Sequence, residues 1–340
     1  LVFAVFLFYP FVKTIYLSLF KTNKYGQAKL FVGMENYTDL LTSSSFQNSL
    51  KVTMIYVVIV VLGSMFLGLV TAVLCNKALI TANVIEKCPS LKYIGLFATG
   101  YNNIDVEKAS EKGITICNAG SYSTDAVAQL VFSYILAFYN KTAEYDRAVK
   151  NDEWIKSETF SYFPYPVYEL SGKTLAIIGY GSIGKKVAEI GHAFGMNIVI
   201  STRTVPENCP YEITDTDTAF EKADILTIHC PLTEKTKGLV NLERLKKMKK
   251  SALLINTSRG GTVIEKDLAY ALENDIIAGA ALDVLEKEPM SENTPLRYAK
   301  NCIITPHIAW ASYETRKRLV KIAADNLKAF INGCPENKIN

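Results

Sequence analysis

Residues 175–184 read Leu-Ala-Ile-Ile-Gly-Tyr-Gly-Ser-Ile-Gly, a short apolar run that leads into the spacing G-x-G-x-x-G. A strand that enters a helix through this spacing is typical of a dinucleotide-binding turn. Gly179 permits the tight turn, Gly181 lets the backbone approach a pyrophosphate, and Gly184 lets the helix pack closely on the strand. The predicted helix, residues 185–194, offers free N–H groups to the phosphates at its start. A simple turn is the alternative, because three glycines alone are a weak signal.

Strand-like and helix-like patterns alternate on both sides of this stretch, as they do in a parallel α/β sheet. The predicted strands are residues 93–98, 114–118, 174–178, 198–201, 225–229, 252–256, 278–282 and 302–305. The longest predicted helix, residues 125–150, has an apolar side made of Ala126, Leu130, Tyr134, Phe138 and Tyr145. The sequence therefore predicts an α/β fold with a Rossmann-type, doubly wound parallel sheet.

The charged residues are unevenly distributed along the 340-residue chain, which is 49% hydrophobic and 21% charged overall. Residues 52–75 carry no charge, and as a helix they would extend ~35 Å, enough to cross a ~30 Å hydrocarbon core. Residues 1–20 are also largely apolar, with Lys13 as the one charge. We therefore predict two transmembrane helices, at about residues 1–20 and 52–75. A helix buried in a soluble core is the alternative for the second stretch.

Net charge and cysteine content argue against several classes of protein. The net charge of +4 is small, and the basic run at residues 246–250 fits a solvated helix end better than a nucleic-acid surface. The seven cysteines contain no C-x-x-C pair, so neither a disulfide framework nor a zinc site is expected. We predict no metal and no nucleic-acid partner, and the cysteine usage fits a reducing compartment such as the cytosol.

The strand after the glycine-rich turn ends without the acidic residue that binds the adenosine ribose of NAD. Residues 198–203 read Ile-Val-Ile-Ser-Thr-Arg, so Thr202 and Arg203 stand where a carboxylate is usual. The Arg203 guanidinium suits the 2′-phosphate of NADP. We therefore expect NAD or NADP as the cofactor, with a preference for NADP. An exposed arginine after a strand is also structurally common.

Polar residues follow three successive predicted strands. Arg259 follows the strand at 252–256, Glu288 with its neighbour Glu286 as the rival carboxylate follows the next, and His307 follows the last. In open α/β sheets the carboxyl ends of the strands border the ligand crevice, so these side chains should meet there. Arg259, Glu288 and His307 are the predicted catalytic residues.

The chemistry of these side chains suits the reduction of a 2-oxo acid. A carboxylate beside His307 favours the imidazolium and keeps a proton available, and the planar fork of Arg259 suits a substrate carboxylate. A structural histidine and a helix-cap or ion-pair arginine are the alternatives. Of the other two histidines, His192 is expected on a helix in a surface or packing role. His229 ends a strand where it could line the nicotinamide pocket, although no residue nearby obviously orients it.

Together these motifs resemble the D-isomer-specific 2-hydroxyacid dehydrogenases, from about residue 76 to the end. The resemblance includes Leu-Lys-Tyr-Ile at 91–94, Ala-Thr-Gly-Tyr-Asn-Asn-Ile-Asp at 98–105, Tyr-Ser-Thr-Asp-Ala-Val-Ala-Gln at 122–129 and Asn-Leu-Lys-Ala-Phe at 326–330. The motifs A-T-G-Y-N-N and P-H-I-A-W-A most resemble those of the glycerate dehydrogenases, also called hydroxypyruvate reductases.

The resemblance implies an NAD(P)-dependent reduction of hydroxypyruvate or glyoxylate to D-glycerate or glycolate. It implies that His307 is the acid/base, that Arg259 anchors the substrate, and that Glu288 is the partner of His307, because the family places this partner just before a proline. The Thr99–Gly100 backbone would hold the substrate carboxylate. The residues expected at the cofactor are Thr124, Gly179, Gly181, Ser182, Ile183, Gly184, Thr202, Arg203, Pro231, Thr257 and Asp283.

Residues 1–75 resemble the start of a sugar-type ABC importer permease, with a Tyr-Pro-Phe break at 9–11, Ser18 and the loop Val-Gly-Met-Glu-Asn-Tyr at 32–37. The chain is then a chimera of a membrane segment and a dehydrogenase. The predicted parts are a membrane segment (1–76), the remnant of a flavodoxin-like substrate lobe (77–120 and 308–340) and a dinucleotide-binding domain (121–307).

The chimera leaves several functional outcomes open. Membrane-type sequence replaces the first part of the substrate lobe, so impaired activity is expected. We predict a cytoplasmic catalytic part attached to a membrane through residues 1–75, and the resemblance implies a homodimer formed by the dinucleotide domain. A cofactor-binding module without turnover and a transport subunit fragment are the alternatives.

Overall fold

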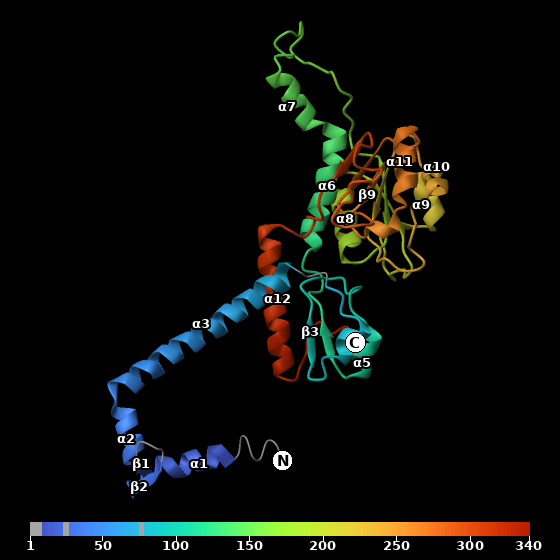
Figure 1. The fold of residues 1–340 in the computed structure, drawn as a ribbon. Helices are drawn as coiled ribbons and strands as arrows, with labels where there is room; N and C mark the ends of the chain where they lie inside the picture. Colours follow the sequence, from blue (N-terminus) through green and yellow to red (C-terminus); the bar gives the residue numbers. More distant parts are fainter. Residues whose placement is uncertain (1–8, 23–26, 75–77) are drawn as a thin grey trace. The chain divides into compact units, whose positions relative to one another are not determined.

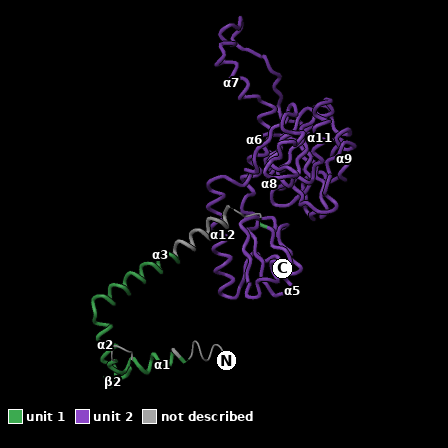
Figure 2. Tube along the Cα trace, in the orientation of Figure 1, with its two compact units in different colours: residues 1–78 green, residues 79–340 purple. Residues whose placement is uncertain are grey.

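The computed structural model describes residues 9–22, 27–74 and 78–340. Contacts within the chain divide it into two compact units, Leu1–Ala78 and Leu79–Asn340, which Figure 2 colours separately. Each unit is described by itself.

The first unit is a short hairpin between helices. Its elements are α1 (Tyr9–Ser18), the antiparallel pair β1 (Phe20–Thr22) and β2 (Ala28–Phe31), α2 (Glu35–Thr42) and α3 (Ser44–Leu74), as Figure 1 shows. The Nδ2 of Asn36 donates to the carbonyl oxygens of Ser18 at 2.8 Å and Phe20 at 3.0 Å. The residues that suggested a permease-like loop are therefore bonded to the end of α1.

The prediction of two membrane-spanning helices is not supported. Among the described residues, one helix is long and apolar enough to cross a membrane, and its qualifying stretch is Ser44–Val61 in α3. This helix begins eight residues before the predicted start at Val52. In the described part of the first predicted span, α1 accounts for 10 residues, whereas about 20 are needed to cross a membrane. Residues 1–8 of the first predicted span lie outside the described part of the chain.

The second unit is built on a parallel seven-stranded sheet with the order β11-β10-β9-β8-β5-β6-β7. Its strands are β5 (Thr174–Ile178), β6 (Asn197–Ser201), β7 (Glu212–Ile213), β8 (Ile225–Ile228), β9 (Leu253–Asn256), β10 (Gly279–Leu282) and β11 (Cys302–Ile304). From β5 the chain adds β6 and β7 on one side, and then adds β8 to β11 in turn on the other side of β5. The predicted doubly wound sheet is confirmed, and β7 is a strand that the sequence did not predict.

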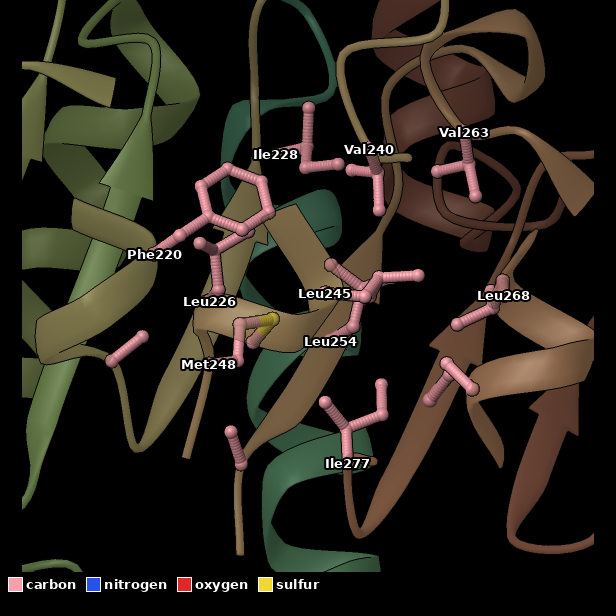
Figure 3. Packing of buried hydrophobic residues seen from close by; sticks show 14 of the residues in the cluster. Phe220, Leu226, Ile228, Val240, Leu245, Met248, Leu254, Val263, Leu268 and Ile277 are labelled. Carbon is pink, nitrogen blue, oxygen red and sulfur yellow. The ribbon is translucent and has the colours of Figure 1, made fainter. Parts of the chain in front are cut away.

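Apolar residues alternate between the two faces of this sheet, because successive side chains of a strand point to opposite sides. In β5, Ala176 and Ile178 belong to one buried cluster, whereas Leu175 and Ile177 belong to another. Figure 3 shows the first cluster, to which Phe220 contributes a fully buried ring. Helices α9 (Thr216–Lys222), α10 (Leu242–Lys247) and α11 (Glu265–Glu273) contribute side chains to this first cluster. Helices α6 (Thr124–Asn140) and α8 (Ser182–Ala193) contribute to the second.

The predicted single helix at residues 125–150 is two helices, α6 and α7 (Thr142–Lys150). The break falls at Lys141, whose φ of 49° lies in the left-handed region.

The buried side of α6 also differs from the prediction. It consists of Val127, Ala128, Val131, Phe132, Tyr134, Ile135 and Tyr139, so of the predicted positions only Tyr134 is buried. The helix after the glycines also begins at Ser182, three residues before the predicted start.

The remaining elements form a smaller lobe around a core of their own. They are α4 (Ala82–Glu86), the parallel strands β3 (Tyr93–Gly95) and β4 (Thr115–Cys117), α5 (Val106–Glu111) and α12 (Tyr313–Ile331). Its apolar core comprises Ile85, Ile94, Leu96, Ile104, Ala109, Ile114 and Ile116. Residues at the end of the chain bind β4, since Ile116 donates its N–H to the Oδ1 of Asn340 at 2.9 Å. The lobe is thus made from two separate parts of the chain.

Candidate active site

The glycine-rich turn lies where the strand order of the sheet reverses, between β5 and β8. A Cβ on Gly179 would lie 2.7 Å from the amide nitrogen of Cys230 and 2.8 Å from the carbonyl carbon of His229, and the φ of Gly179 is +99°. Only glycine fits this approach and this backbone conformation. Ligands of open α/β sheets bind at such reversals, outside the carboxyl ends of the strands.

The start of α8 is built to accept a dinucleotide. Gly181 is its N-cap, and a Cβ there would meet no atom within 4 Å, so the approach to the helix N-terminus is open. A Cβ on Gly184 would lie 2.2 Å from the carbonyl oxygen of Gly179, so the close turn requires glycine here. The side chain of Ile183 packs on the apolar core. Among the described residues, the buried Oγ1 of Thr257 finds no hydrogen-bond partner. These residues fit NAD or NADP, whose polar groups would satisfy Thr257.

Two predicted cofactor residues each bond to Ser121, a serine that the sequence did not single out. The Ser182 and Ser121 hydroxyls lie 2.9 Å apart, and the Thr124 hydroxyl donates to the carbonyl oxygen of Ser121 at 3.0 Å. Ser121 joins the smaller lobe to α6, so this contact connects that junction to the start of α8. A serine in a loop gives no sequence signal for such a role.

The other predicted cofactor residues lie in loops after the sheet strands. After β6, the Thr202 hydroxyl donates to the carbonyl oxygen of Thr204 at 3.3 Å, and Arg203 is exposed. After β8, the carbonyl oxygen of Pro231 accepts the hydroxyl of Thr236 at 2.6 Å. The exposed guanidinium is available to a phosphate.

His307 and Glu288 are paired. The Nδ1 of His307 lies 2.8 Å from Oε2 of Glu288, and both side chains are partly exposed, at 30% and 22%. A carboxylate only accepts, so Nδ1 carries the hydrogen in this pair. The N–H of Leu285 donates to the other oxygen of Glu288 at 3.2 Å. The backbone N–H of Glu286 bonds elsewhere and its side chain is exposed, so of the two carboxylates Glu288 is the one beside the histidine.

The turn that carries His307 is fixed by Asp283, which is 1% exposed. One carboxylate oxygen accepts the hydroxyl of Thr305 at 2.5 Å and the N–H of Ile308 at 2.7 Å, and the other accepts the N–H of Ala309 at 2.8 Å. The N–H of His307 donates to the carbonyl oxygen of Asp283 at 2.8 Å. Asp283 was expected at the cofactor, yet its carboxylate is occupied by this turn, which holds His307 at a φ of 55°.

Arg259 lies directly against the loop at residues 99–100. A Cβ on Gly100 would stand 1.9 Å from Nη2 of Arg259. The loop itself is fixed, because the Thr99 carbonyl oxygen accepts Nδ2 of Asn118 at 2.7 Å and the Thr99 hydroxyl donates to the carbonyl oxygen of Gly120 at 2.5 Å. The structure therefore brings the predicted anchor and the predicted carboxylate-binding backbone together.

A buried tyrosine next to Arg259 was also absent from the predicted site. Burial raises the pKa of Tyr122 to about 12, although the nearby Arg259 charge acts in the opposite direction. Tyr122 belongs to a small apolar cluster with Ala119 and Leu319, against which Trp310 packs. This cluster supports the arginine side of the site from α12.

The other two histidines have different environments. His192 is exposed, with its ring centroid 6.0 Å from that of Tyr211. Burial lowers the pKa of His229 to about 3, and its Nε2 lies 2.9 Å from the hydroxyl of Thr227. The prediction that nothing orients His229 is therefore wrong. His229 is neutral at neutral pH, which leaves His307 as the histidine paired with a carboxylate.

Comparison with known proteins agrees with this geometry. The family model described as D-isomer specific 2-hydroxyacid dehydrogenase, NAD binding domain, matches residues 132–309. A hydroxypyruvate reductase from Blautia hydrogenotrophica is 40% identical over 270 residues, which cover 78% of this chain and 83% of that protein. A glycerate dehydrogenase from Methylorubrum extorquens is 39% identical over 266 residues, which cover 78% and 83%.

A solved structure is similar over the same region. It is an NADPH-dependent glyoxylate/hydroxypyruvate reductase from Sinorhizobium meliloti in complex with NADP and malonate. The two chains are 32% identical and superpose with a TM-score of 0.68 over 75% of this chain and 80% of that one.

Proposed function

The chain belongs to the D-isomer specific 2-hydroxyacid dehydrogenase family, and we propose that within it the protein reduces hydroxypyruvate or glyoxylate to D-glycerate or glycolate. It is an NAD(P)-dependent oxidoreductase that interconverts a 2-oxo acid and a 2-hydroxy acid. The choice of substrate rests on the names of its relatives, which include a hydroxypyruvate reductase and a glycerate dehydrogenase. The single observation that carries the catalytic proposal is the pair formed by His307 and Glu288.

The proposed mechanism assigns one task to each polar side chain. Arg259, beside the Gly100 backbone, binds the substrate carboxylate through its planar fork. With Nδ1 of His307 engaged by Glu288, Nε2 is the nitrogen that gives its proton to the carbonyl oxygen. Glu288 stabilises the imidazolium that donates this proton. A nicotinamide cofactor held at the glycine-rich turn would supply the hydride for this reduction.

The proposed cofactor site follows the glycine-rich turn. Gly179, Gly181 and Gly184 would hold the pyrophosphate at the start of α8 together with Ser182. Thr257 would contact the cofactor through its buried Oγ1, which has no partner among the described residues. NAD and NADP both fit the family, and the exposed Arg203 favours NADP.

The proposed homodimer would form through the dinucleotide domain, here residues 121–307. This proposal is supported by α7 and the loop that follows α7, which extend away from the sheet in Figure 1. This region exposes large apolar side chains that water would otherwise surround, namely Trp154, Ile155, Phe160, Phe163, Val167 and Tyr168. A Phe160→Asp, Phe163→Asp variant should sediment as a monomer, and an unchanged sedimentation coefficient would contradict this interface.

The membrane attachment and permease-like origin of the first 75 residues remain proposals. The apolar helix α3 supports attachment, since the side chains of Tyr56 and Ile59 are 66% and 64% exposed. The division of the second unit into a substrate lobe and a dinucleotide domain is likewise a prediction. Membrane flotation of the full chain, compared with residues 79–340 alone, tests the attachment.

A direct assay tests the proposed reaction. Full-length protein in detergent should oxidise NADPH in the presence of hydroxypyruvate or glyoxylate, and His307→Ala should abolish turnover without weakening NADPH binding. Retained NADPH binding with no turnover in the parent protein would overturn the proposal. It would favour a cofactor-binding protein whose incomplete substrate lobe no longer supports the reaction.

A further inference from the structure

The segment between β10 and β11 carries Glu288, and a single carboxylate outside the predicted site holds this segment at two points. Glu265 is the first residue of α11. Its Oε1 accepts the N–H of Glu286 at 2.8 Å, and its Oε2 accepts the hydroxyl of Thr294 at 2.7 Å. Glu288 lies in the sequence between these two points. The segment that carries Glu288 is therefore fixed to the N-terminus of α11 on both sides of Glu288.

A backbone contact reinforces the first of these points. A Cβ on Gly260 would stand 1.9 Å from the carbonyl carbon and oxygen of Leu285, and 2.4 Å from the amide nitrogen of Glu286. The turn after β9, which carries Arg259, thus lies directly against the peptide whose N–H binds Glu265. The arginine turn and the Glu288 segment form one packed unit.

We propose that Glu265 is a positioning residue, which holds the segment so that Glu288 accepts the Nδ1–H of His307. The inference rests on the proposed function, because that function gives Glu288 and His307 their roles. The pair is separated by 2.8 Å and is partly exposed, so water competes for both partners once the segment moves. A misplacement of about 1 Å at a catalytic group can cost about 100-fold in rate.

The acceptor chemistry explains why an acidic residue stands here. Glu265 faces two donors, an amide N–H and a hydroxyl, and a carboxylate offers one oxygen to each. Glutamine can satisfy the same neighbours, since its oxygen accepts the N–H and its NH₂ donates to Thr294, whose hydroxyl then turns to accept. Alanine satisfies neither. Glu265→Gln is therefore the conservative variant and Glu265→Ala the disruptive one.

A purely structural role would come from the position of Glu265 in the first turn of α11, where an acidic side chain stabilises the helix dipole. Asp267 shares that turn, and its carboxylate accepts the N–H of Leu242 at 2.9 Å instead of binding the Glu288 segment. Asp267→Ala is thus a matched control, because it removes a first-turn acid from the same helix and leaves the segment anchored.

The decisive measurement is the ring NMR spectrum of the full chain labelled with ¹⁵N-histidine, which has only three histidines. In Glu265→Ala the His307 ring signals should move to the positions seen in Glu288→Ala. Glu265→Gln and Asp267→Ala should leave them in place. The signals of His192 and His229 report whether the fold is intact. An unmoved His307 signal in folded Glu265→Ala would overturn the proposal.

Kinetics supplies a second readout and separates this proposal from the proposed function. Glu265→Ala should lower kcat by up to about 100-fold with less than a twofold change in the KM for hydroxypyruvate. If the parent protein has no turnover, the proposed function fails while the NMR shift still decides the role of Glu265. If Glu265→Ala does not fold, Thr294→Val removes one anchor and should shift the His307 signals in the same direction; no shift would then contradict the role.

Discussion

Gly100 and Arg259 are so close that a methyl group on the glycine would stand 1.9 Å from Nη2 of the arginine. The two residues come from different parts of the second unit, Gly100 from the loop after β3 and Arg259 from the turn after β9. Their contact joins the smaller lobe to the large sheet at the proposed substrate site. The position of the guanidinium therefore depends on the absence of a side chain at residue 100.

We expect Gly100→Ala to displace the guanidinium and raise the KM for hydroxypyruvate by about 10- to 100-fold, since a hydrogen bond to a charged group contributes roughly 1.5–3 kcal/mol. Arg259→Lys keeps the charge, loses the planar fork and should have a similar effect. The dissociation constant of NADPH should stay unchanged in both. Steady-state kinetics and fluorescence titration measure these quantities, and an unaltered KM in Gly100→Ala would show that the substrate binds elsewhere.

Two neighbouring glutamates provide a matched pair of variants. Glu288→Gln removes the negative charge beside His307 and should lower kcat by about 10²- to 10⁴-fold, the usual contribution of acid/base catalysis. Glu286→Gln should change kcat less than twofold, because that side chain is exposed. The assay is NADPH oxidation with hydroxypyruvate at saturating substrate. Equal losses in the two variants would contradict the assignment of Glu288.

The stability of the second unit should depend on pH through His229. Burial lowers the pKa of this histidine from 6.5 to about 3, so the unfolded chain binds a proton more readily than the folded one. Stability is then fully present above pH 6.5 and falls between pH 6.5 and about 3, with a slope of at most about 1.4 kcal/mol per pH unit. Urea unfolding at several pH values should give a shallower slope for His229→Gln. Parallel slopes for the two proteins would rule out this contribution.

Arg203 should determine the choice between the two cofactors. Arg203→Ala removes the exposed guanidinium after β6 and should raise the dissociation constant of NADPH by about 10- to 100-fold. Binding of NADH, which has no 2′-phosphate, should change less than twofold. Arg147→Ala, which removes another exposed arginine on α7, is the control. An NADPH affinity that survives Arg203→Ala would place the phosphate elsewhere.

Much of the sheet and the site could be predicted, because the relevant signals are local. Buried parallel strands are continuous apolar runs, and β5 was predicted with its observed bounds, Thr174–Ile178. The pairing of Glu288 with His307 follows from the rule that strand ends meet at one edge, and the same rule predicts Arg259 at that edge. The choice of Glu288 over Glu286 came from the family resemblance alone, since both carboxylates stand in one short run.

Features set by tertiary contacts could not be predicted. Strand β7 has two residues, Glu212–Ile213, and no apolar run marks it. The break between α6 and α7 falls at Lys141, where neither glycine nor proline gives a signal. The bond between His229 and Thr227 is an exception, because side chains two residues apart on a strand point to the same face and this local signal was overlooked. The role of Glu265, by contrast, depends on where a distant loop returns to α11.

The smaller lobe is assembled from segments that lie far apart in the chain, and this has a consequence for biogenesis. The bond between Ile116 and Asn340 joins residues separated by 224 positions, and α12 enters the same lobe. A ribosome therefore makes the whole dinucleotide-binding sheet before it makes the residues that complete the lobe. Because domains generally fold in the order of synthesis, the sheet is expected to form first and to serve as a template. A newly made chain would bind its cofactor before it is able to hold a substrate.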